Sequence, residues 1–347
     1  MQTNPNLENF IEYVVKHKAS DLHLSAGNYP ITRIDGELSQ IPNTKIIESV
    51  ELFAMLDSIM NELQRNTYKE EFELDFAMKS KFNNRFRVNV FNTINGPAAV
   101  FREIPSESIT LLEISAPAVI SELCKLHQGL VLVVGPAGSG KSTTLAAMIN
   151  HINANYKRHI ITIEDPVEFT YKSNLSLINQ REVGFNTESF PIALRSALRE
   201  DPNVIMVGEM RDLETIHLAL TAAETGHLVM ATLHTKSAAQ SINRIIDVFP
   251  AADKDLVRSM VASSLKAVIS QRLVKKENGG RTAIYEVMIA NTSIKNLIRE
   301  DKVQQINSMI EIGKKQGMVT SKDSILDLFN RKVISKETAE ELLGSCE

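Results

Sequence analysis

The chain has 347 residues, of which 43% are hydrophobic and 23% are charged, and its formal net charge at pH 7 is −4. This composition predicts a soluble protein of two domains, and the acidic balance gives no electrostatic reason to expect nucleic acid as a main partner. No apolar run approaches the roughly 18 residues of a membrane-spanning helix, and the first residues lack a signal-peptide pattern. We therefore expect a cytoplasmic protein without direct membrane insertion. The two cysteines, Cys124 and Cys346, are too few for a disulfide framework or a structural zinc site.

The first hundred residues predict a small α+β domain, which we place at residues 1–104. Apolar residues recur at helical spacing across residues 6–18, and the alternating stretch SDLHLS follows as a strand. The Asp-Gly pair at 35–36 lies between two partly apolar runs and predicts a hairpin turn, because both residue types tolerate a positive φ. Residues 46–63 predict a helical segment. FELDFAM and RFRVNVF alternate like strands, and an Asn-Gly-Pro turn follows at 95–97.

A different pattern follows this domain. Residues 105–118 are bracketed by prolines and lack clear periodicity, which predicts an interdomain linker. Over residues 119–290 the apolar runs GLVLVVG, HIITIED, VIMVGE and HLVMATLHT alternate with helical patterns. Such runs are typical of central strands in a parallel sheet that helices cover on both faces. Residues 291–347 are more charged and predict a C-terminal helical extension.

The stretch GPAGSGKST matches the phosphate-loop pattern and lies between an apolar strand and a helical run. Its glycines allow the backbone N–H groups to point at phosphate oxygens, and the start of the helix adds further donors. Lys141 is expected to reach the β- and γ-phosphates, and Ser142 is expected to ligate Mg²⁺. A glycine-rich turn without a ligand is the alternative. We predict that ATP and Mg²⁺ bind at the nine loop residues: Gly135, Pro136, Ala137, Gly138, Ser139, Gly140, Lys141, Ser142 and Thr143.

Polar residues beside three other predicted strands are candidates for positioning the attacking water and for sensing the phosphate. Glu164 and Glu168 follow the strand in TIEDPVEF, and Glu209 follows VIMV, at the edge of a parallel sheet where ligands usually bind. His227 and His234 flank the strand in TGHLVMATLHT. The alternatives are solvated loop carboxylates and ordinary core or surface histidines.

The order of these motifs resembles the secretion ATPase superfamily, which powers type II secretion and type IV pili. The phosphate loop, TIEDPVE, LREDPNVIMVGEMRD and TGHLVMATLHT are similar to its Walker A, Asp box, Walker B and His box. The resemblance implies that Glu209 takes part in binding Mg²⁺, directly or through water, and that Glu164 is the catalytic carboxylate, with Glu168 as the fallback. His227 and His234 would contact the phosphate region. The implied fold is α/β, with a small PAS-like α+β N-terminal domain followed by a RecA-like P-loop NTPase domain.

The resemblance extends into the first domain, where ASDLHLSAG, RIDG and FRVNVF are similar to the PAS-like domain of this family. In RFRVNVF, Arg85 and Arg87 alternate with apolar residues, so both guanidinium groups leave the same face of the strand. By resemblance, Arg87 and Arg102 are the arginine fingers that act on a neighbouring subunit's nucleotide, and Arg85 is the next candidate for this role. Exposed sheet arginines without this role are the alternative.

Within the superfamily the chain resembles the pilus retraction ATPases, the PilT-type members. The sequence has no paired CxxC motif of the kind found in assembly ATPases, and we expect no extra N-terminal domain like theirs. SIKNLIRE nearly matches the retraction signature AIRNLIRE. Ser293 and Lys295 depart from that signature, and Asn203 replaces the usual Asp before Walker B. The resemblance implies a homohexameric ATPase at the cytoplasmic face of the inner membrane that drives pilus retraction and twitching motility. Its implied partners are an inner-membrane pilus platform protein and a second retraction ATPase.

Other functions remain open on the sequence alone. Within the superfamily, the alternatives are an accessory, PilU-like retraction ATPase and an ATPase of pilus assembly or type II secretion. Outside it, a RecA-like nucleic-acid translocase would show DNA-stimulated hydrolysis, and a regulatory nucleotide-binding switch would show negligible turnover.

Overall fold

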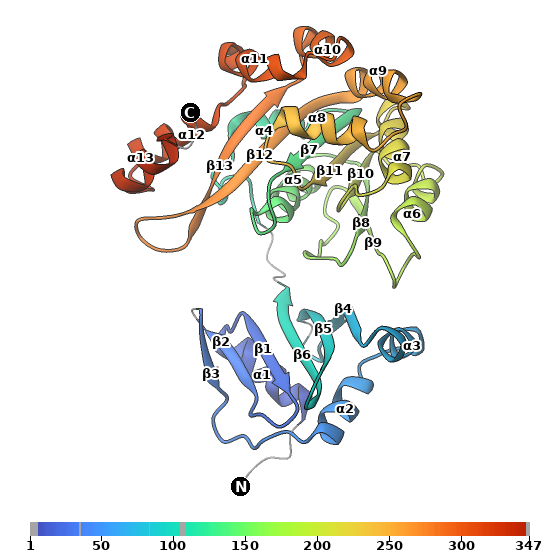
Figure 1. The fold of residues 1–347 in the computed structure, drawn as a ribbon, viewed down its shortest axis with the longest axis vertical. Helices are drawn as coiled ribbons and strands as arrows, with labels where there is room; N and C mark the ends of the chain where they lie inside the picture. Colours follow the sequence, from blue (N-terminus) through green and yellow to red (C-terminus); the bar gives the residue numbers. More distant parts are fainter. Residues whose placement is uncertain (1–5, 35, 83, 105–108, 345–347) are drawn as a thin grey trace. The chain divides into compact units, whose positions relative to one another are not determined.

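The computed structural model describes residues 6–34, 36–82, 84–104 and 109–344. The chain divides into two compact units, Met1–Glu107 with Pro166–Thr170, and Ser108–Asp165 with Tyr171–Glu347. Each unit contains one β-sheet (Figure 1). The first division between the units falls inside the predicted linker, of which residues 105–108 lie outside the described part of the chain.

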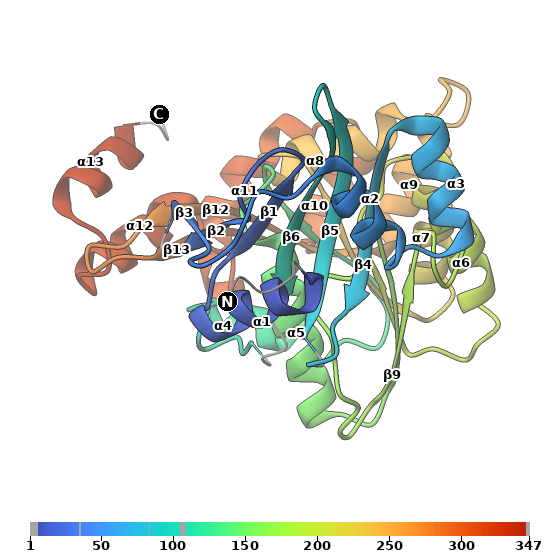
Figure 2. The same ribbon diagram turned by 90° about the horizontal axis from the view of Figure 1, so that it is seen from below.

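The first unit contains a six-stranded antiparallel sheet in the order β3-β2-β1-β6-β5-β4. Along β5, Phe86, Val88 and Val90 enter the core, whereas Arg87 and Asn89 point to the opposite face. Helices α1 and α2 cover the core face (Figure 2). The elements are α1 Leu7–His17, β1 Asp21–Ser25, β2 Ile31–Ile34, β3 Glu37–Gln40, α2 Ser49–Asp57, α3 Glu62–Glu71, β4 Glu73–Lys79, β5 Arg85–Thr93 and β6 Gly96–Ile104.

Two predicted features of this unit have different outcomes. The hairpin is present, with Ile34 opposite Glu37 across β2 and β3, although Asp35 lies outside the described residues. The single helical segment predicted at 46–63 is instead shorter: α2 ends at Asp57, and a second helix, α3, begins at Glu62 and continues past the predicted segment. Asn61 starts the second helix through a capping box, in which its side chain accepts from Gln64 N–H and the Gln64 side chain accepts from Asn61 N–H.

The second unit contains a seven-stranded sheet in the order β13-β12-β7-β11-β10-β8-β9, in which only β13 runs antiparallel. Its elements up to the end of the sheet are α4 Ala118–Leu123, β7 Gly129–Val134, α5 Lys141–Asn155, β8 His159–Glu164, β9 Leu177–Glu182, α6 Phe190–Ala197, β10 Val204–Val207, α7 Leu213–Glu224, β11 Leu228–Leu233, α8 Ala238–Asp247, α9 Lys254–Ser264, β12 Leu265–Lys275 and β13 Arg281–Ile289. The C-terminal elements are α10 Thr292–Arg299, η1 Val303–Gln305, α11 Ile306–Ile312, η2 Gly313–Gln316, α12 Ser321–Asn330 and α13 Lys336–Gly344.

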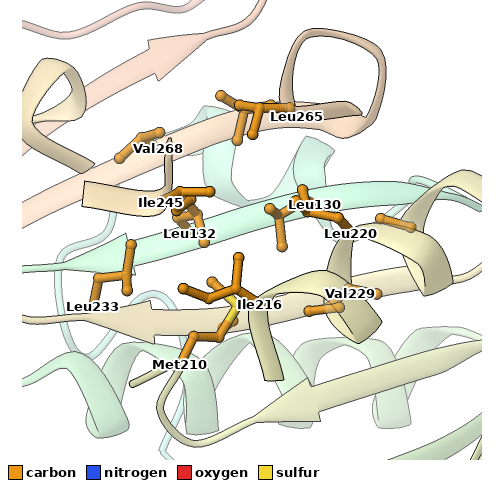
Figure 3. Close-up of a cluster of buried hydrophobic side chains, with 14 of the residues drawn as sticks. Leu130, Leu132, Met210, Ile216, Leu220, Val229, Leu233, Ile245, Leu265 and Val268 are labelled. Atoms are coloured by element: carbon orange, nitrogen blue, oxygen red, sulfur yellow. The ribbon is translucent and has the colours of Figure 1, made fainter. Parts of the chain in front are cut away.

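Side chains of the central strands in this second sheet are buried on both faces, as the continuous apolar runs predict. Along β7, Leu130, Leu132 and Val134 enter one hydrophobic cluster, whereas Val131 and Val133 enter another. The first cluster joins the sheet to α6 through α11, and part of it is drawn in Figure 3. Helices α4 and α5 pack on the second face. The C-terminal helices α10 and α11 therefore share the core of the sheet.

The fold class predicted from the sequence is confirmed, because a small α+β unit precedes an α/β unit built on a parallel sheet. None of the helices in the described part of the chain is both long and apolar enough to cross a membrane.

Candidate active site

The predicted phosphate loop connects the carboxyl end of β7 to the first turn of α5. Positive φ angles of 154°, 73° and 86° at Gly135, Gly138 and Gly140 curl its backbone, and residues with a side chain rarely adopt this conformation. Because α5 begins at Lys141, the unpaired N–H groups and the positive dipole end of the helix face the loop. This backbone can bind phosphate.

The ammonium group of Lys141 is buried in the loop, and the residue is only 8% exposed. Its Nζ donates to the main-chain oxygens of Gly135 at 2.9 Å and Pro136 at 3.0 Å, and it lies 3.4 Å from His234 Nδ1. An ammonium group can only donate, so His234 Nδ1 is the acceptor in this contact. The ring can then donate in the opposite direction.

The acceptor on that side is Glu209, which follows β10. His234 Nε2 lies 3.1 Å from Glu209 Oε1, and Arg211 Nη2 lies 2.7 Å from Glu209 Oε2. Burial acts to raise the pKa of Glu209, but the hydrogen bonds of Arg211 and His234 and the positive charge of Arg211 outweigh it and hold the pKa below its ordinary value. Glu209 is therefore ionised at neutral pH and is connected through His234 to Lys141.

Gly208, which precedes Glu209, allows the end of β10 to lie against the end of β8. Its N–H donates to the main-chain oxygen of Ile163 at 2.8 Å, and a Cβ at this position would lie 3.3 Å from the Cα of Glu164. Thr232 of β11 donates its hydroxyl to the main-chain oxygen of Gly208. The close approach explains a glycine before the glutamate, and it brings Glu164 and Glu209 to the same edge of the sheet.

Glu164 is the last residue of β8 and is 5% exposed. Its Oε1 accepts hydrogen bonds from Thr162 Oγ1 at 2.7 Å and from Gln180 Nε2 at 3.2 Å. Glu168, by contrast, is exposed. A buried carboxylate with a fixed orientation is better suited to orient a water molecule than an exposed one, so the geometry favours Glu164 over the fallback.

The structure separates the two predicted histidines. His227 precedes β11, and its main-chain oxygen accepts from Gly129 N–H at the start of β7, whereas His234 follows β11 beside the phosphate loop. The six-residue strand between them spans about 20 Å. Within a single chain, His234 therefore lies beside the phosphate loop and His227 lies at the other end of the strand, so contact of His227 with the phosphate region stays a prediction.

The predicted arginine fingers lie on the face of the first sheet opposite to its core. Arg87 and Arg102 are paired across β5 and β6, and Arg85 is two residues before Arg87. Arg87 Nε lies 3.2 and 3.1 Å from the two carboxylate oxygens of Asp75, which its Nη2 also contacts. Arg102 Nε donates to Asp21 Oδ1 at 2.8 Å.

Asp21 and Arg102 differ strongly in their exposure. The side chain of Asp21 is 6% exposed and that of Arg102 is 68% exposed. Burial acts to raise the pKa of Asp21, but hydrogen bonds from Ser20 and Arg102 outweigh it and place the pKa below its ordinary value. A buried, ionised carboxylate thus anchors an exposed guanidinium group.

Residues that the sequence analysis did not select support the predicted ones, among them Arg211, which contacts Glu209. Thr162 and Gln180 hold Glu164, and Asp21 and Asp75 hold the arginines. Gln271 contacts the phosphate loop. Thr162 and Gln271 could have been noticed as polar residues within apolar strand patterns, in ITIE and VISQRLV. The pattern does not show which contact such a polar residue makes.

The site fits a magnesium nucleotide. Within the described ranges, no three His, Cys, Asp or Glu side chains cluster as a metal site. Mg²⁺ does not need such a cluster, because it is usually bound by one or two protein oxygens together with substrate phosphates and water. Ser142 in the first turn of α5 and ionised Glu209 are oxygen donors of the required kind. When bound, Mg²⁺ supplies positive charge that stabilises phosphoryl transfer.

Asn203, which departs from the usual Asp, lies at the opposite edge of the sheet. Its Oδ1 accepts from His159 N–H at 2.7 Å, at the start of β8. A carboxylate would accept the same hydrogen bond. The departure therefore preserves the contact between β8 and β10 and lies away from the loop.

Comparison with known proteins identifies the family. The family model described as "Type II/IV secretion system protein" matches residues 2–338. The chain belongs to this family. It is 51% identical over 336 residues to the type IV pilus retraction ATPase PilT of Pseudomonas aeruginosa, covering 97% of each protein. It is 53% identical over 311 residues to a twitching motility protein of Neisseria gonorrhoeae, covering 89% of this chain and 83% of that protein.

A crystal structure of the pilus retraction motor PilT with bound ADP superposes with a TM-score of 0.90 at 43% identity, covering 98% of this chain and 97% of the other. The predictions of an ATPase and of a PilT-type member of the family are confirmed. So is the order of an N-terminal domain followed by a RecA-like ATPase domain. The roles of the individual residues and the PAS-like character of the first unit stay predictions.

Proposed function

We propose that this chain is a hexameric, ATP-hydrolysing motor that drives type IV pilus retraction and thereby twitching motility. The observation that carries the proposal is the connection from Lys141 through His234 to Glu209, which joins the phosphate loop to the ends of two neighbouring strands. The identity of 51% with PilT over nearly the whole chain supports retraction as the task.

Within one subunit, the proposed roles follow from the positions of the side chains. Lys141 and the loop N–H groups would bind the phosphates, and Ser142 and Glu209 would hold Mg²⁺, in the case of Glu209 directly or through water. Glu164 would orient the attacking water. A change in charge at the phosphates would shift Lys141, and His234, which contacts both Lys141 and Glu209, would shift Glu209 in turn.

The arginines would complete the site from a neighbouring subunit. Head-to-tail contacts close into a ring when the rotation permits, and we propose a homohexamer with Arg87 and Arg102 acting in trans, supported by Arg85. Rotation between the domains at residues 105–118 would turn an inner-membrane platform protein at the cytoplasmic face of the membrane. A second retraction ATPase is a further proposed partner.

The task of the motor is tested by a chromosomal Glu209→Gln allele in the source bacterium, with surface pili counted by electron microscopy beside a twitching assay. The allele should leave cells with excess pili and without twitching, because the motor no longer pulls pili in. Cells without pili would instead indicate assembly, and unchanged cells would indicate an accessory ATPase or another machine. Purified protein whose hydrolysis is stimulated by DNA in a salt-sensitive way would indicate a translocase.

The arginine finger is tested with mixed rings. Arg87→Ala should abolish turnover while ATP binding is retained, and Lys141→Ala should also be inactive. Mixing the two variants should restore part of the activity, because some interfaces then combine an intact Lys141 with an intact Arg87. Arg65→Ala, on α3 of the same unit, is the matched control and should remain active. Normal turnover by Arg87→Ala alone would refute the role in trans.

A further inference from the structure

Gln271 of β12 lies against the phosphate loop and donates one hydrogen bond to it. The pairing of β12 with β7 ends at Ser270 opposite Val134, whereas β12 stays paired with β13 through Gln271 and beyond. Gln271 is therefore the first residue of β12 past the end of β7, and it lies beside the start of the loop. Its Nε2 donates to the main-chain oxygen of Ser139 at 2.6 Å. A Cβ at Gly135 would lie 2.3 Å from its main-chain oxygen, and a Cβ at Gly140 would lie 3.1 Å from its Nε2.

The hydrogen bond to Ser139 determines the direction of the next main-chain donor. The peptide group between Ser139 and Gly140 is planar, and in a trans peptide the N–H points opposite to the C=O. Since Gln271 holds the Ser139 oxygen on the side of β12, the Gly140 N–H is directed away from β12. That N–H belongs to the residue just before α5, where phosphate oxygens bind in a loop of this type.

Burial makes this contact sensitive to change. Gln271 is 4% exposed, and its Oε1 and the nearby Ser139 Oγ are buried without a hydrogen-bond partner among the described residues. Buried polar atoms in folded proteins are usually paired, with protein or with a bound group. The two unpaired atoms lie at the loop that the proposed nucleotide would occupy.

We infer that Gln271 is a positioning residue for nucleotide binding, which holds the Ser139–Gly140 peptide so that its N–H faces the phosphates. The inference rests on the proposed role of the loop as the nucleotide site. Gln271 acts through the loop backbone, so the interaction it improves is the binding of the phosphates. Its removal should therefore raise KM for ATP more than it lowers kcat.

The test measures affinity for the fluorescent nucleotide N-methylanthraniloyl-ADP in the full-length protein. Gln271→Met keeps the length and bulk of the side chain but removes the donor. We expect about tenfold weaker binding, which corresponds to losing one hydrogen bond from the Gly140 N–H to a phosphate oxygen. Gln271→Glu should bind still more weakly, because it places an oxygen against the Ser139 oxygen and a negative charge near the phosphates. Ser270→Ala, the neighbour on β12 that is also buried, should bind normally.

Two readouts separate positioning from a loss of stability. The melting temperature of the nucleotide-free protein should be the same for Gln271→Met and Ser270→Ala, and kcat at saturating ATP should be largely retained in Gln271→Met. If Gln271→Met does not fold, Gln271→Asn replaces it, because this amide is one methylene too short to reach Ser139. If Gln271→Met binds the nucleotide normally while Lys141→Ala loses affinity, the role of Gln271 is refuted and the nucleotide site is not. Unchanged affinity in Lys141→Ala would overturn the nucleotide site as well.

Discussion

The two sheets present their candidate functional side chains in different places. In the parallel sheet, Glu164, Glu209 and His234 lie at strand ends, because the interiors of the strands are buried on both faces. In the antiparallel sheet, Arg87 and Arg102 lie within strands, on the face that does not enter the core. When helices cover both faces of a sheet, functional side chains can reach a ligand only from the ends of the strands. When only one face is covered, functional side chains can also lie along the strands, on the uncovered face.

The two arrangements also differ in what holds the side chains. At the strand ends, main-chain contacts such as the one from Gly208 to Ile163 determine where the carboxylates lie. On the open face, long and flexible arginines are held by charged partners, Asp75 and Asp21. The positions of the carboxylates at the strand ends therefore depend on close packing of the backbone, and the positions of the arginines on the uncovered face depend on ion pairs.

The largest expected effect on activity comes from a substitution at a strand end of the parallel sheet. Glu164→Gln should lower kcat by about 10²–10⁴-fold, because an amide cannot accept a proton from the attacking water. Affinity for ATP should be retained, which an equilibrium binding titration measures beside steady-state hydrolysis. Glu168→Gln is the matched control, and a larger loss in Glu168→Gln would transfer the role to that residue.

The burial of the two sheets is compared by alanine substitutions at adjacent positions. In β7, Leu132→Ala should cost about 2–5 kcal/mol of unfolding free energy, and Val133→Ala should also destabilise the unit, because both faces are packed. In β5, Val88→Ala should destabilise, whereas Asn89→Ala should stay within about 0.5 kcal/mol. Hydrogen exchange read by mass spectrometry reports each unit separately. Equal costs at 88 and 89 would contradict the one-sided core.

The ion pair on the open face should give the smallest effect, and one that depends on pH. Because the pKa of folded Asp21 is below its ordinary value of 3.8, its charge stabilises the fold above that pH, and this stabilisation is lost as the pH falls through the folded pKa. Asp21→Asn should cost about 1–2 kcal/mol at pH 7, and thermal unfolding of the two proteins should converge below pH 3.8.

The matched control for this prediction is Asp75→Asn, which breaks an ion pair whose two side chains are both partly exposed. It should cost no more than about 1 kcal/mol. A difference between wild type and Asp21→Asn that grows on acidification would contradict the assignment of the lowered pKa.

Much of the site could be predicted because its signals are local. The phosphate loop needs glycines at fixed positions, and the carboxylates that follow apolar runs must reach the carboxyl edge of a parallel sheet. The same argument could have placed His227 at the opposite edge from His234, since a residue before a strand lies at the amino edge. The break between α2 and α3 was also local, but the capping pair Asn61 and Gln64 was not recognised.

The sequence by itself determined the two kinds of sheet, the phosphate loop and the strand ends that carry Glu164 and Glu209, because periodicity and turn chemistry act between near neighbours. Only the tertiary structure decided that Asp21 pairs with Arg102 and that Gln271 reaches Ser139. These contacts join residues that are 81 and 132 positions apart, and they depend on strand order and register. Both are set by the packing of the whole unit.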